Sequence, residues 1–192
     1  MKVGILGLQG DVREHAHLVE AAGGTPVIVK HAEELGDVAG LVLPGGESTT
    51  IGKLLDRSGI LEPLRERALV GMPLFGTCAG AILMARHVLG REPIPHSLAV
   101  MDISVVRNAY GRQVDSFEAD LEVAGLDAPL RSVFIRAPVI EEIGEGVEIL
   151  SRYDGHPVLV RQANMLASTF HPEIAGDERV HAGFLEMIRR TG

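Results

Sequence analysis

Cysteine is almost absent from this sequence, which contains one thiol, Cys78, in 192 residues. A single cysteine excludes an intrachain disulfide and fits a protein of the reducing cytoplasm. No apolar run reaches the roughly 20 residues that a membrane-spanning helix needs. The apolar start at residues 3–8 is too short for a signal peptide, and charged residues follow it at once. We therefore expect a soluble cytoplasmic protein.

Positive charge is also scarce. Lysine and arginine number 18 against 26 aspartates and glutamates, which gives a formal net charge of −8. A nucleic-acid surface is not expected, because phosphate binding needs clustered cations. The chain is 46% hydrophobic, enough to bury one large core. Because it contains no internal repeat, low-complexity tract or linker-like segment, we expect one domain spanning residues 1–192.

Short apolar runs alternate with amphipathic helical patterns in the first half. This rhythm predicts an α/β fold of three layers, with a mostly parallel central sheet and helices on both faces. Loops at the carboxyl ends of such strands form the active site in many proteins of this class. The expected strands are residues 2–8, 26–30, 40–43 and 73–76, and the expected helices are residues 11–22 and 51–69, the latter as one or two helices.

The pattern of apolar and polar residues changes after the proline-rich segment at residues 91–95. The short segments of alternating polarity beyond it predict antiparallel strands appended to the central sheet, followed by a closing helix at residues 177–190. The expected strands are residues 102–106, 116–123, 133–135, 147–150, 156–160 and 165–169.

Cys78 lies in Gly76-Thr77-Cys78-Ala79-Gly80, where an apolar strand gives way to an apolar helix. Gly-x-Cys-x-Gly is the thiol counterpart of the nucleophile elbow, a tight turn that exposes the reactive side chain above the strand ends. A helix beginning at Ala79 would direct backbone N–H groups at the sulfur and favour the thiolate. The alternative is an inert cysteine that packs as a small apolar side chain.

His171 and Glu173 flank Pro172 far along the chain. We expect Pro172 to keep this segment extended, so that the two side chains point the same way. His171 could then take the thiol proton while Glu173 holds its other ring nitrogen, as in a catalytic triad. The alternative is a surface turn.

The loop Pro44-Gly45-Gly46-Glu47-Ser48 follows the apolar run at residues 40–43. Consecutive glycines let a backbone approach a ligand and point N–H groups into a concave site, so the loop could form an oxyanion hole. The alternative is an ordinary strand-to-helix turn with Ser48 or Thr49 as the helix N-cap.

Together these motifs resemble the class I glutamine amidotransferases. The loop sequences are most similar to those of the glutaminase subunits of pyridoxal 5′-phosphate synthase, and the similarity covers nearly the whole chain. The segments that carry it are residues 6–10 with Arg13-Glu14-His15, and residues 44–50, 75–80, 107–118, 133–138 and 170–173.

The resemblance implies hydrolysis of L-glutamine by a Cys-His-Glu triad, with Gly46 and Ala79 supplying the oxyanion N–H groups. We expect no cofactor. For Glu47 the alternative is a helix-start charge, and for Arg107 a surface ion pair. The glutamine contacts implied by the resemblance are Gly46, Glu47, Ser48, Arg107, Ile135 and Arg136.

Ammonia released into water would be lost, so a partner is expected. The resemblance implies a synthase subunit that forms a dodecameric core with docked glutaminase subunits. We expect Gln9 and Gly10 to couple the site to that partner. Rival functions are a glutaminase for another acceptor, such as histidine biosynthesis, a cysteine hydrolase or stress protein of the same architecture, and a non-catalytic regulatory module.

No metal site is expected. His15 and His17 lie two apart on a predicted helix, so they face different directions and make a poor pair of metal ligands. We expect both to be solvated or interfacial. The glycines at positions 4, 7 and 10 have the wrong spacing for a dinucleotide loop, which argues against NAD.

Overall fold

The computed structural model describes residues 1–90, 96–107 and 116–191, and its centre is a seven-stranded sheet. Five of the strands run parallel, and two antiparallel strands extend one edge. In spatial order they are β10 (Val147–Tyr153), β11 (His156–Gln162), β12 (Met165–Ser168), β4 (Leu74–Thr77), β3 (Leu41–Leu43), β1 (Lys2–Leu6) and β2 (Thr25–Val29).

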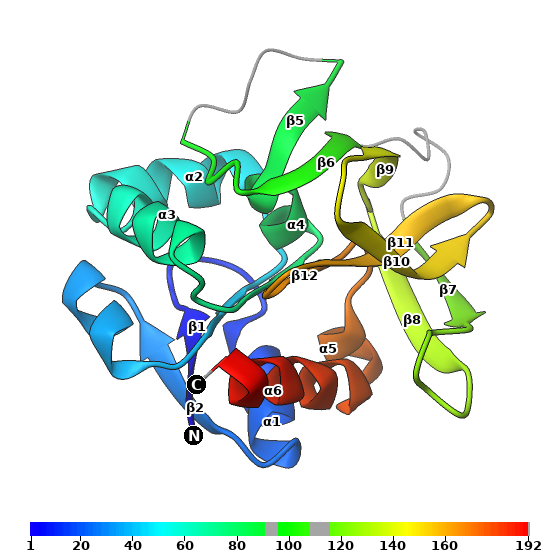
Figure 1. The fold of residues 1–192 in the computed structure, drawn as a ribbon, viewed down its shortest axis with the longest axis horizontal. Helices are drawn as coiled ribbons and strands as arrows, with labels where there is room; N and C mark the ends of the chain where they lie inside the picture. Colours follow the sequence, from blue (N-terminus) through cyan, green and yellow to red (C-terminus); the bar gives the residue numbers. More distant parts are fainter. Residues whose placement is uncertain (91–95, 108–115, 192) are drawn as a thin grey trace.

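Helices cover both faces of this sheet, as Figure 1 shows. One face carries α2 (Ser48–Arg57), α3 (Leu61–Leu69) and α4 (Ala79–Met84), and the other carries α1 (Val12–Ala21), α5 (Pro172–Ala175) and α6 (Arg179–Thr191). A 3-10 helix, η1 (Ala32–Asp37), follows β2. The predicted three-layer α/β architecture is confirmed. The predicted helix over residues 51–69 is two helices that begin at Ser48.

The central strands are apolar because both of their faces are covered. Leu41 and Leu43 pack into the core under α2 and α4, whereas Val42 between them packs into the core under α1 and α6. Leu74 and Phe75 of β4 divide in the same way. Strands buried on both faces become continuous apolar runs, which is why they could be found in the sequence.

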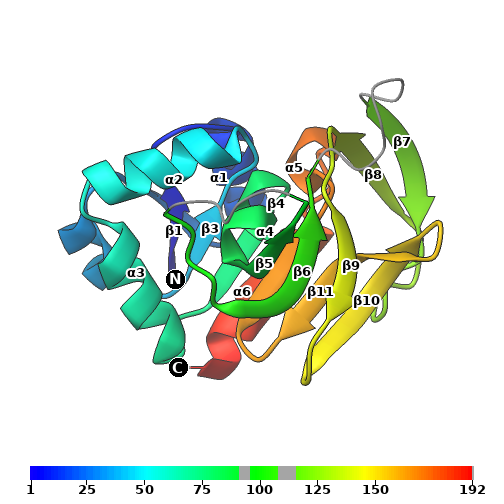
Figure 2. The same cartoon turned by 90° about the horizontal axis from the view of Figure 1, so that it is seen from above.

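The second half departs from expectation in how its strands pair. We predicted residues 165–169 as an appended antiparallel strand, but β12 pairs parallel with β4 inside the central sheet. A three-stranded sheet of β5 (Ala85–Leu89), β6 (Met101–Val106) and β9 (Val139–Ile143) forms outside the hydrogen-bond ladder of the central sheet. So does the two-stranded sheet of β7 (Ser116–Leu121) and β8 (Leu130–Ile135), seen at the edge of the molecule in Figure 2. Alternating polarity identifies a half-buried strand but carries no information about its partner.

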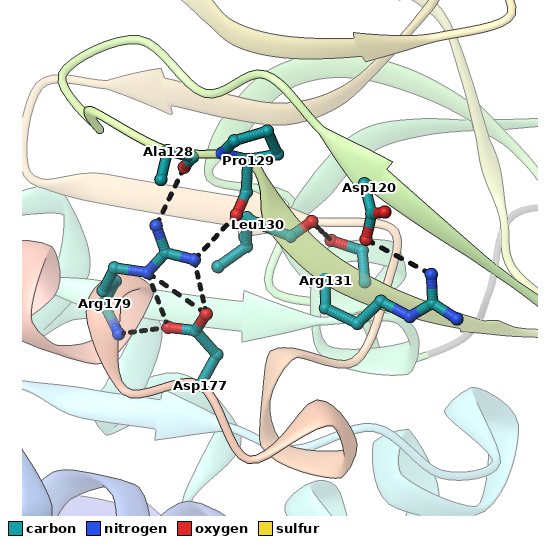
Figure 3. Close-up of polar contacts among 8 residues, drawn as sticks. Asp120, Ala128, Pro129, Leu130, Arg131, Asp177 and Arg179 are labelled. Carbon is teal, nitrogen blue, oxygen red and sulfur yellow. Dashed lines mark hydrogen bonds and ion pairs between the residues drawn. The ribbon is translucent and has the colours of Figure 1, made fainter.

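The start of α6 is tied to the loop that precedes β8. The Arg179 guanidinium donates to the carbonyl oxygens of Ala128 and Pro129 at 2.8 and 2.9 Å and pairs with Asp177 at 2.6 Å (Figure 3). These bonds anchor the entry to β8, which also contributes backbone to the site described below. Within the described ranges, no helix is both long and apolar enough to cross a membrane.

Candidate active site

Cys78 occupies the turn between β4 and α4 in a backbone conformation that is rare for a side-chain-bearing residue. Its φ is 47° and its ψ is −100°. Such strain persists only where the surroundings impose it, and it is common at functional sites. A Cβ at Gly80 would overlap the carbonyl oxygen of Leu43, so glycine allows α4 to pack directly against β3. The elbow is present, but Cys78 itself carries the strain.

Strand β8 brings the second half of the chain to this turn. The Val133 carbonyl accepts the backbone N–H of His171 at 2.8 Å, and the Ile135 carbonyl lies 3.8 Å from the Cys78 sulfur, within hydrogen-bond reach. Carbonyls two residues apart on a strand face the same side. One strand therefore orients both the thiol and the backbone of His171.

The predicted partnership of His171 and Glu173 is present in the geometry. Nδ1 of His171 lies 2.7 Å from Oε1 of Glu173, and both residues are buried. The expected extended segment is wrong, because Pro172 is the first residue of α5. Proline is well tolerated there, since the first helical residue needs no N–H partner. Glu173 thus reaches back to the ring from the first turn of a helix.

The charges at the site reinforce one another. Burial by itself lowers the pKa of His171. Hydrogen bonds with Asp11, Cys78 and Glu173 outweigh burial and raise this pKa to about 12. Burial by itself raises the pKa of Glu173, but His15 and His171 hold this pKa well below its usual range. An ionised carboxylate beside an imidazolium is the arrangement that stabilises a thiolate.

The loop after β3 lies against the ring of His171. Its φ at Gly46 is +153°, and a Cβ there would come within 2.5 Å of Oε1 of Gln9. The same oxygen of Gln9 accepts the backbone N–H of Glu47 at 3.0 Å. A Cβ at Gly10 would overlap the Gly45 carbonyl oxygen. Gln9 and Gly10 therefore touch the predicted oxyanion loop, while their role toward a partner stays a prediction.

An open pocket of about 580 Å³ lies at this junction and contains Cys78 and His171. A volume of this order suits a small-molecule ligand. Ala79, the other predicted oxyanion donor, is buried at the first position of α4. Every predicted glutamine contact lines the pocket: Gly46, Glu47, Ser48, Arg107, Ile135 and Arg136.

Two of these predicted contacts also have local roles. Glu47 is the N-cap of α2, and its carboxylate accepts the N–H groups of Thr49 and Thr50 at 3.1 and 2.7 Å. The alternative in which Ser48 or Thr49 caps this helix is wrong, because Glu47 is the N-cap. Arg107 pairs with Glu47 at 3.3 Å and donates to the Thr49 hydroxyl at 3.3 Å. The helix-start charge and the ion pair are thus both present on the pocket wall, and the glutamine contacts of Glu47 and Arg107 stay predictions.

Two neighbours of the predicted triad are not anticipated by the sequence. Oδ2 of Asp11 lies 3.4 Å from Nδ1 of His171, and Nε2 of His15 lies 3.4 Å from Oε1 of Glu173. Asp11 had only the appearance of a helix start. The expectation that His15 is solvated or interfacial is wrong, because it is fully buried; His17 is exposed as expected. The helical period of the first helix, which puts His15 in line with the buried Leu18 and Val19, was the available signal.

Ligand atoms of Asp11, His171 and Glu173 lie within 4.8 Å of one another, a spacing that a metal ion could use. His171 Nδ1 would then need a free lone pair, but at 2.7 Å from a carboxylate it is placed to donate a proton. The expected absence of a metal stays a prediction. Residues 108–115, part of the segment 107–118 that carried the resemblance, lie outside the described residues.

Comparisons with known proteins give a consistent result. The model of the SNO glutamine amidotransferase family matches residues 5–190. Pyridoxal 5′-phosphate synthase subunit PdxT of Niallia circulans is 53% identical over 191 residues, with 100% of each chain covered. The protein of that name from Frankia casuarinae is 56% identical over 192 residues, covering 100% of this chain and 96% of its own.

Solved structures agree. A crystal structure described as a glutamine amidotransferase has a TM-score of 0.93 and 50% identity, covering 97% of this chain and 98% of its own. One chain of the PurLQS structure from Thermotoga maritima has a TM-score of 0.67 at 18% identity, covering 99% of this chain and 95% of its own, and shows the shared fold alone.

Proposed function

Because the chain belongs to the SNO glutamine amidotransferase family, we propose that Cys78, His171 and Glu173 are the triad with which it hydrolyses glutamine. The chain is a glutaminase: it converts L-glutamine to L-glutamate and ammonia, and the ammonia passes to the pyridoxal 5′-phosphate synthase subunit for vitamin B6 biosynthesis. We take residues 1–192 as one glutaminase domain. The main observation in support of the triad is the 2.7 Å hydrogen bond between His171 and Glu173, close to Cys78 with its strained backbone.

The reaction begins with the thiolate. Cys78 attacks the side-chain amide carbon of glutamine, forming a carbon–sulfur bond and a tetrahedral oxyanion. Backbone N–H groups of Gly46 and Ala79 stabilise that oxyanion, and His171 protonates the departing ammonia. A water molecule, deprotonated by His171, then attacks the glutamyl thioester and releases glutamate. Glu173 stays ionised throughout and stabilises the imidazolium.

Glutamine binding requires groups for its α-carboxylate and its side chain. Arginine is the natural partner of a carboxylate, because its planar fork donates two parallel hydrogen bonds. Arg107 and Arg136 stand on the pocket wall and are the proposed carboxylate ligands. Arg136 adopts a φ of 45°, a strained conformation that fits a residue held in place for binding. Gly46, Glu47, Ser48 and Ile135 complete the proposed contacts.

The acceptor subunit is proposed to cover the pocket. In the proposed complex, which forms in the cytoplasm, glutaminase subunits dock around a dodecameric core of acceptor subunits. Ile135 and Ile174 expose 39% and 44% of their surface near the triad, which is apolar area suited to a partner. Gln9 and Gly10 are proposed to transmit docking, because both touch the oxyanion loop. No cofactor and no metal is proposed for the glutaminase step.

The decisive experiment measures two products. Glutamate release from glutamine is followed with and without the synthase subunit, and pyridoxal phosphate formation is followed in the complex. We expect both products with wild-type protein and neither with Cys78→Ala. Glutamate release without pyridoxal phosphate would favour a glutaminase for another acceptor, such as histidine biosynthesis. Absence of glutamate release in every condition would favour a regulatory module or a hydrolase of another class.

Coupling through Gln9 has its own test. Gln9→Ala removes the acceptor of the Glu47 N–H, so the oxyanion loop loses its link to the segment after β1. We expect the activation of glutaminase activity by the synthase to fall, while binding of the synthase remains. Unchanged activation in this variant would reject the proposed role of Gln9.

A further inference from the structure

A chain of buried side chains continues behind the triad. His15 of α1 and His181 of α6, here called the imidazole pair, are both 0% exposed. Nδ1 of His15 lies 2.9 Å from Nε2 of His181. On its other side, Nε2 of His15 lies 3.4 Å from Oε1 of Glu173 and 3.1 Å from Oγ1 of Thr77. The Glu173 oxygen that accepts His171 thus also faces His15.

The surroundings of the imidazole pair indicate where its protons reside. Nδ1 of His181 has no hydrogen-bond partner among the described residues. A buried N–H without an acceptor costs more than a buried lone pair without a donor. His181 is neutral, because burial and the nearby His15 lower its pKa to about 3. The favoured arrangement therefore places the single proton of His181 on Nε2, from which it is donated to Nδ1 of His15.

That arrangement determines what His15 presents to the triad. With Nδ1 accepting from His181, the proton on Nε2 of His15 is directed at Glu173 and Thr77. Thr77 ends β4 and precedes Cys78, and it lies on the same sheet face as Phe75, whose ring contacts both imidazoles edge-on. The sheet and two helices thus hold this N–H in place.

We propose that His15 is a positioning residue of the triad, whose protonated Nε2 lies 3.4 Å from Oε1 of Glu173 and helps to keep this carboxylate ionised, with His181 setting the tautomer of His15. The proposal rests on the function proposed above. It follows from burial: a carboxylate withdrawn from water needs donors to remain charged. The second oxygen of Glu173, Oε2, is buried and has no partner among the described residues, so Oε1 carries the stabilisation alone.

The titratable groups around Glu173 come from three elements. His15 faces it from α1 and His171 from the residue preceding α5, while His181 stands behind His15 on α6. Asp11, at the N-cap of α1, faces the His171 ring at 3.4 Å and repels a charged Glu173 through it. Without His15, burial and this repulsion would both favour the protonated carboxyl. Activity needs the charged form of Glu173. Removal of His15 should therefore reduce activity first at the acid end of the pH profile.

The test uses the acid limb of the pH profile of kcat/KM in the complex with the synthase. Glutamine at position 15 can place an amide N–H where Nε2 of the ring lies, whereas asparagine reaches only the place of Nδ1. We expect His15→Asn and His15→Leu to move the acid limb to higher pH by about one unit or more. His15→Gln should keep the limb near its wild-type position.

A second readout does not depend on turnover. Cys78 is the only thiol in the chain, so its alkylation by iodoacetamide in the free protein reports the thiolate directly. If Glu173 loses charge, the imidazolium of His171 loses stabilisation, and the midpoint of alkylation against pH rises. We expect that rise in His15→Asn and His15→Leu. The matched control is His17→Gln, an exposed histidine of the same helix, with an unchanged midpoint.

The outcomes distinguish failure of this proposal from failure of the triad. Equal loss of activity at every pH, with limb and midpoint unchanged in His15→Asn, would show that His15 is only structural and overturn the proposal. So would equal behaviour of the glutamine and asparagine variants, and this comparison holds if the leucine variant does not fold. Glutamate release by Cys78→Ala would instead overturn the proposed triad.

Discussion

Gly45 lies directly against the ring of His171. A Cβ on this glycine would overlap Cε1 of the imidazole and lie 2.9 Å from Nδ1, with Oδ2 of Asp11 at 3.2 Å. The loop that carries the proposed oxyanion donor and the proposed general base are therefore one packed unit. The position of the base depends on the absence of one methyl group.

Gly45→Ala should reduce activity without unfolding the protein. The added methyl displaces the His171 ring from the thiol, and misplacement of a catalytic group by about 1 Å can cost about 10²-fold in rate. Steady-state kinetics of glutamate release in the complex would measure this effect. Gly36→Ala is the matched control, because a Cβ there meets nothing within 4 Å. Equal kinetics of the two variants would contradict the packing argument.

Glu173→Gln should be close to inactive. A glutamine amide is uncharged, so it can neither stabilise the imidazolium nor enforce the tautomer with a proton on Nδ1. Replacement of the corresponding carboxylate in a serine-protease triad costs about 10⁴-fold in kcat, and we expect a loss of similar order. The control is Glu178→Gln, an exposed carboxylate of the following turn. Retention of more than a tenth of the activity would argue against a triad role for Glu173.

Arg107→Ala should raise the KM for glutamine more than it lowers kcat. Arg107 lies on the pocket wall, and a carboxylate that loses a charge-assisted bond typically loses about 1.5–3 kcal/mol, roughly 10- to 100-fold in affinity. The initial-rate dependence on glutamine concentration separates the two constants. Arg131→Ala is the control, since this exposed arginine pairs with Asp120 away from the pocket (Figure 3). An unchanged KM would leave Arg107 as the ion-pair partner of Glu47 alone.

The folded protein should lose stability as the pH falls below 6.5, in part through His181. The pKa of His181 is lowered to about 3 by burial and by His15, while in the unfolded chain it is near 6.5. Between these values only the unfolded chain binds the proton, so stability falls with decreasing pH by up to about 1.4 kcal/mol per unit. Glu173 acts in the same direction, because its lowered pKa makes its contribution present above the unfolded value near 4.5 and lost below it.

The measurement is the free energy of unfolding at pH 7.5 and at pH 5. His181→Gln removes the titrating group, so the difference between the two pH values should shrink by about 2 kcal/mol, even if the variant is less stable at both. His87→Gln is the control, because His87 is exposed on β5. An undiminished difference in His181→Gln would show that other groups carry the acid sensitivity.

Gly183→Ala should stabilise the protein. Gly183 is exposed within α6, and a Cβ there meets nothing within 4 Å. Alanine is favoured over glycine in a helix by about 0.5–1 kcal/mol. The melting temperature should therefore rise by about 1–4 °C for a chain of this size. A lower melting temperature would indicate that α6 needs the glycine for a reason other than packing.

The elements and the reactive residues were predictable to different degrees. Apolar runs such as Leu41-Val42-Leu43 indicate buried strands, and the glycines around Cys78 indicate the nucleophile elbow. A helix-start charge at Glu47 is indicated by the sequence, since a carboxylate at a helix start has a local signature, but the candidate caps in the sequence were Ser48 and Thr49, whereas the structure gives this role to Glu47. The strands β5 and β9 were missed, because Ala85–Leu89 and Val139–Ile143 are partly exposed and lack a clear alternation.

By itself, the sequence determined the α/β layering and the presence of a thiol, an imidazole and a carboxylate in motifs suited to one site. Those features are local, since they depend on side-chain period, turn residues and spacing. The parallel pairing of β12 with β4 and the contact of His15 with Glu173 follow from the tertiary structure alone. The same is true of the contact between His15 and His181, which are 166 residues apart in the chain. Contacts between distant segments depend on how whole layers pack, and a local sequence pattern does not specify which layer a segment packs against.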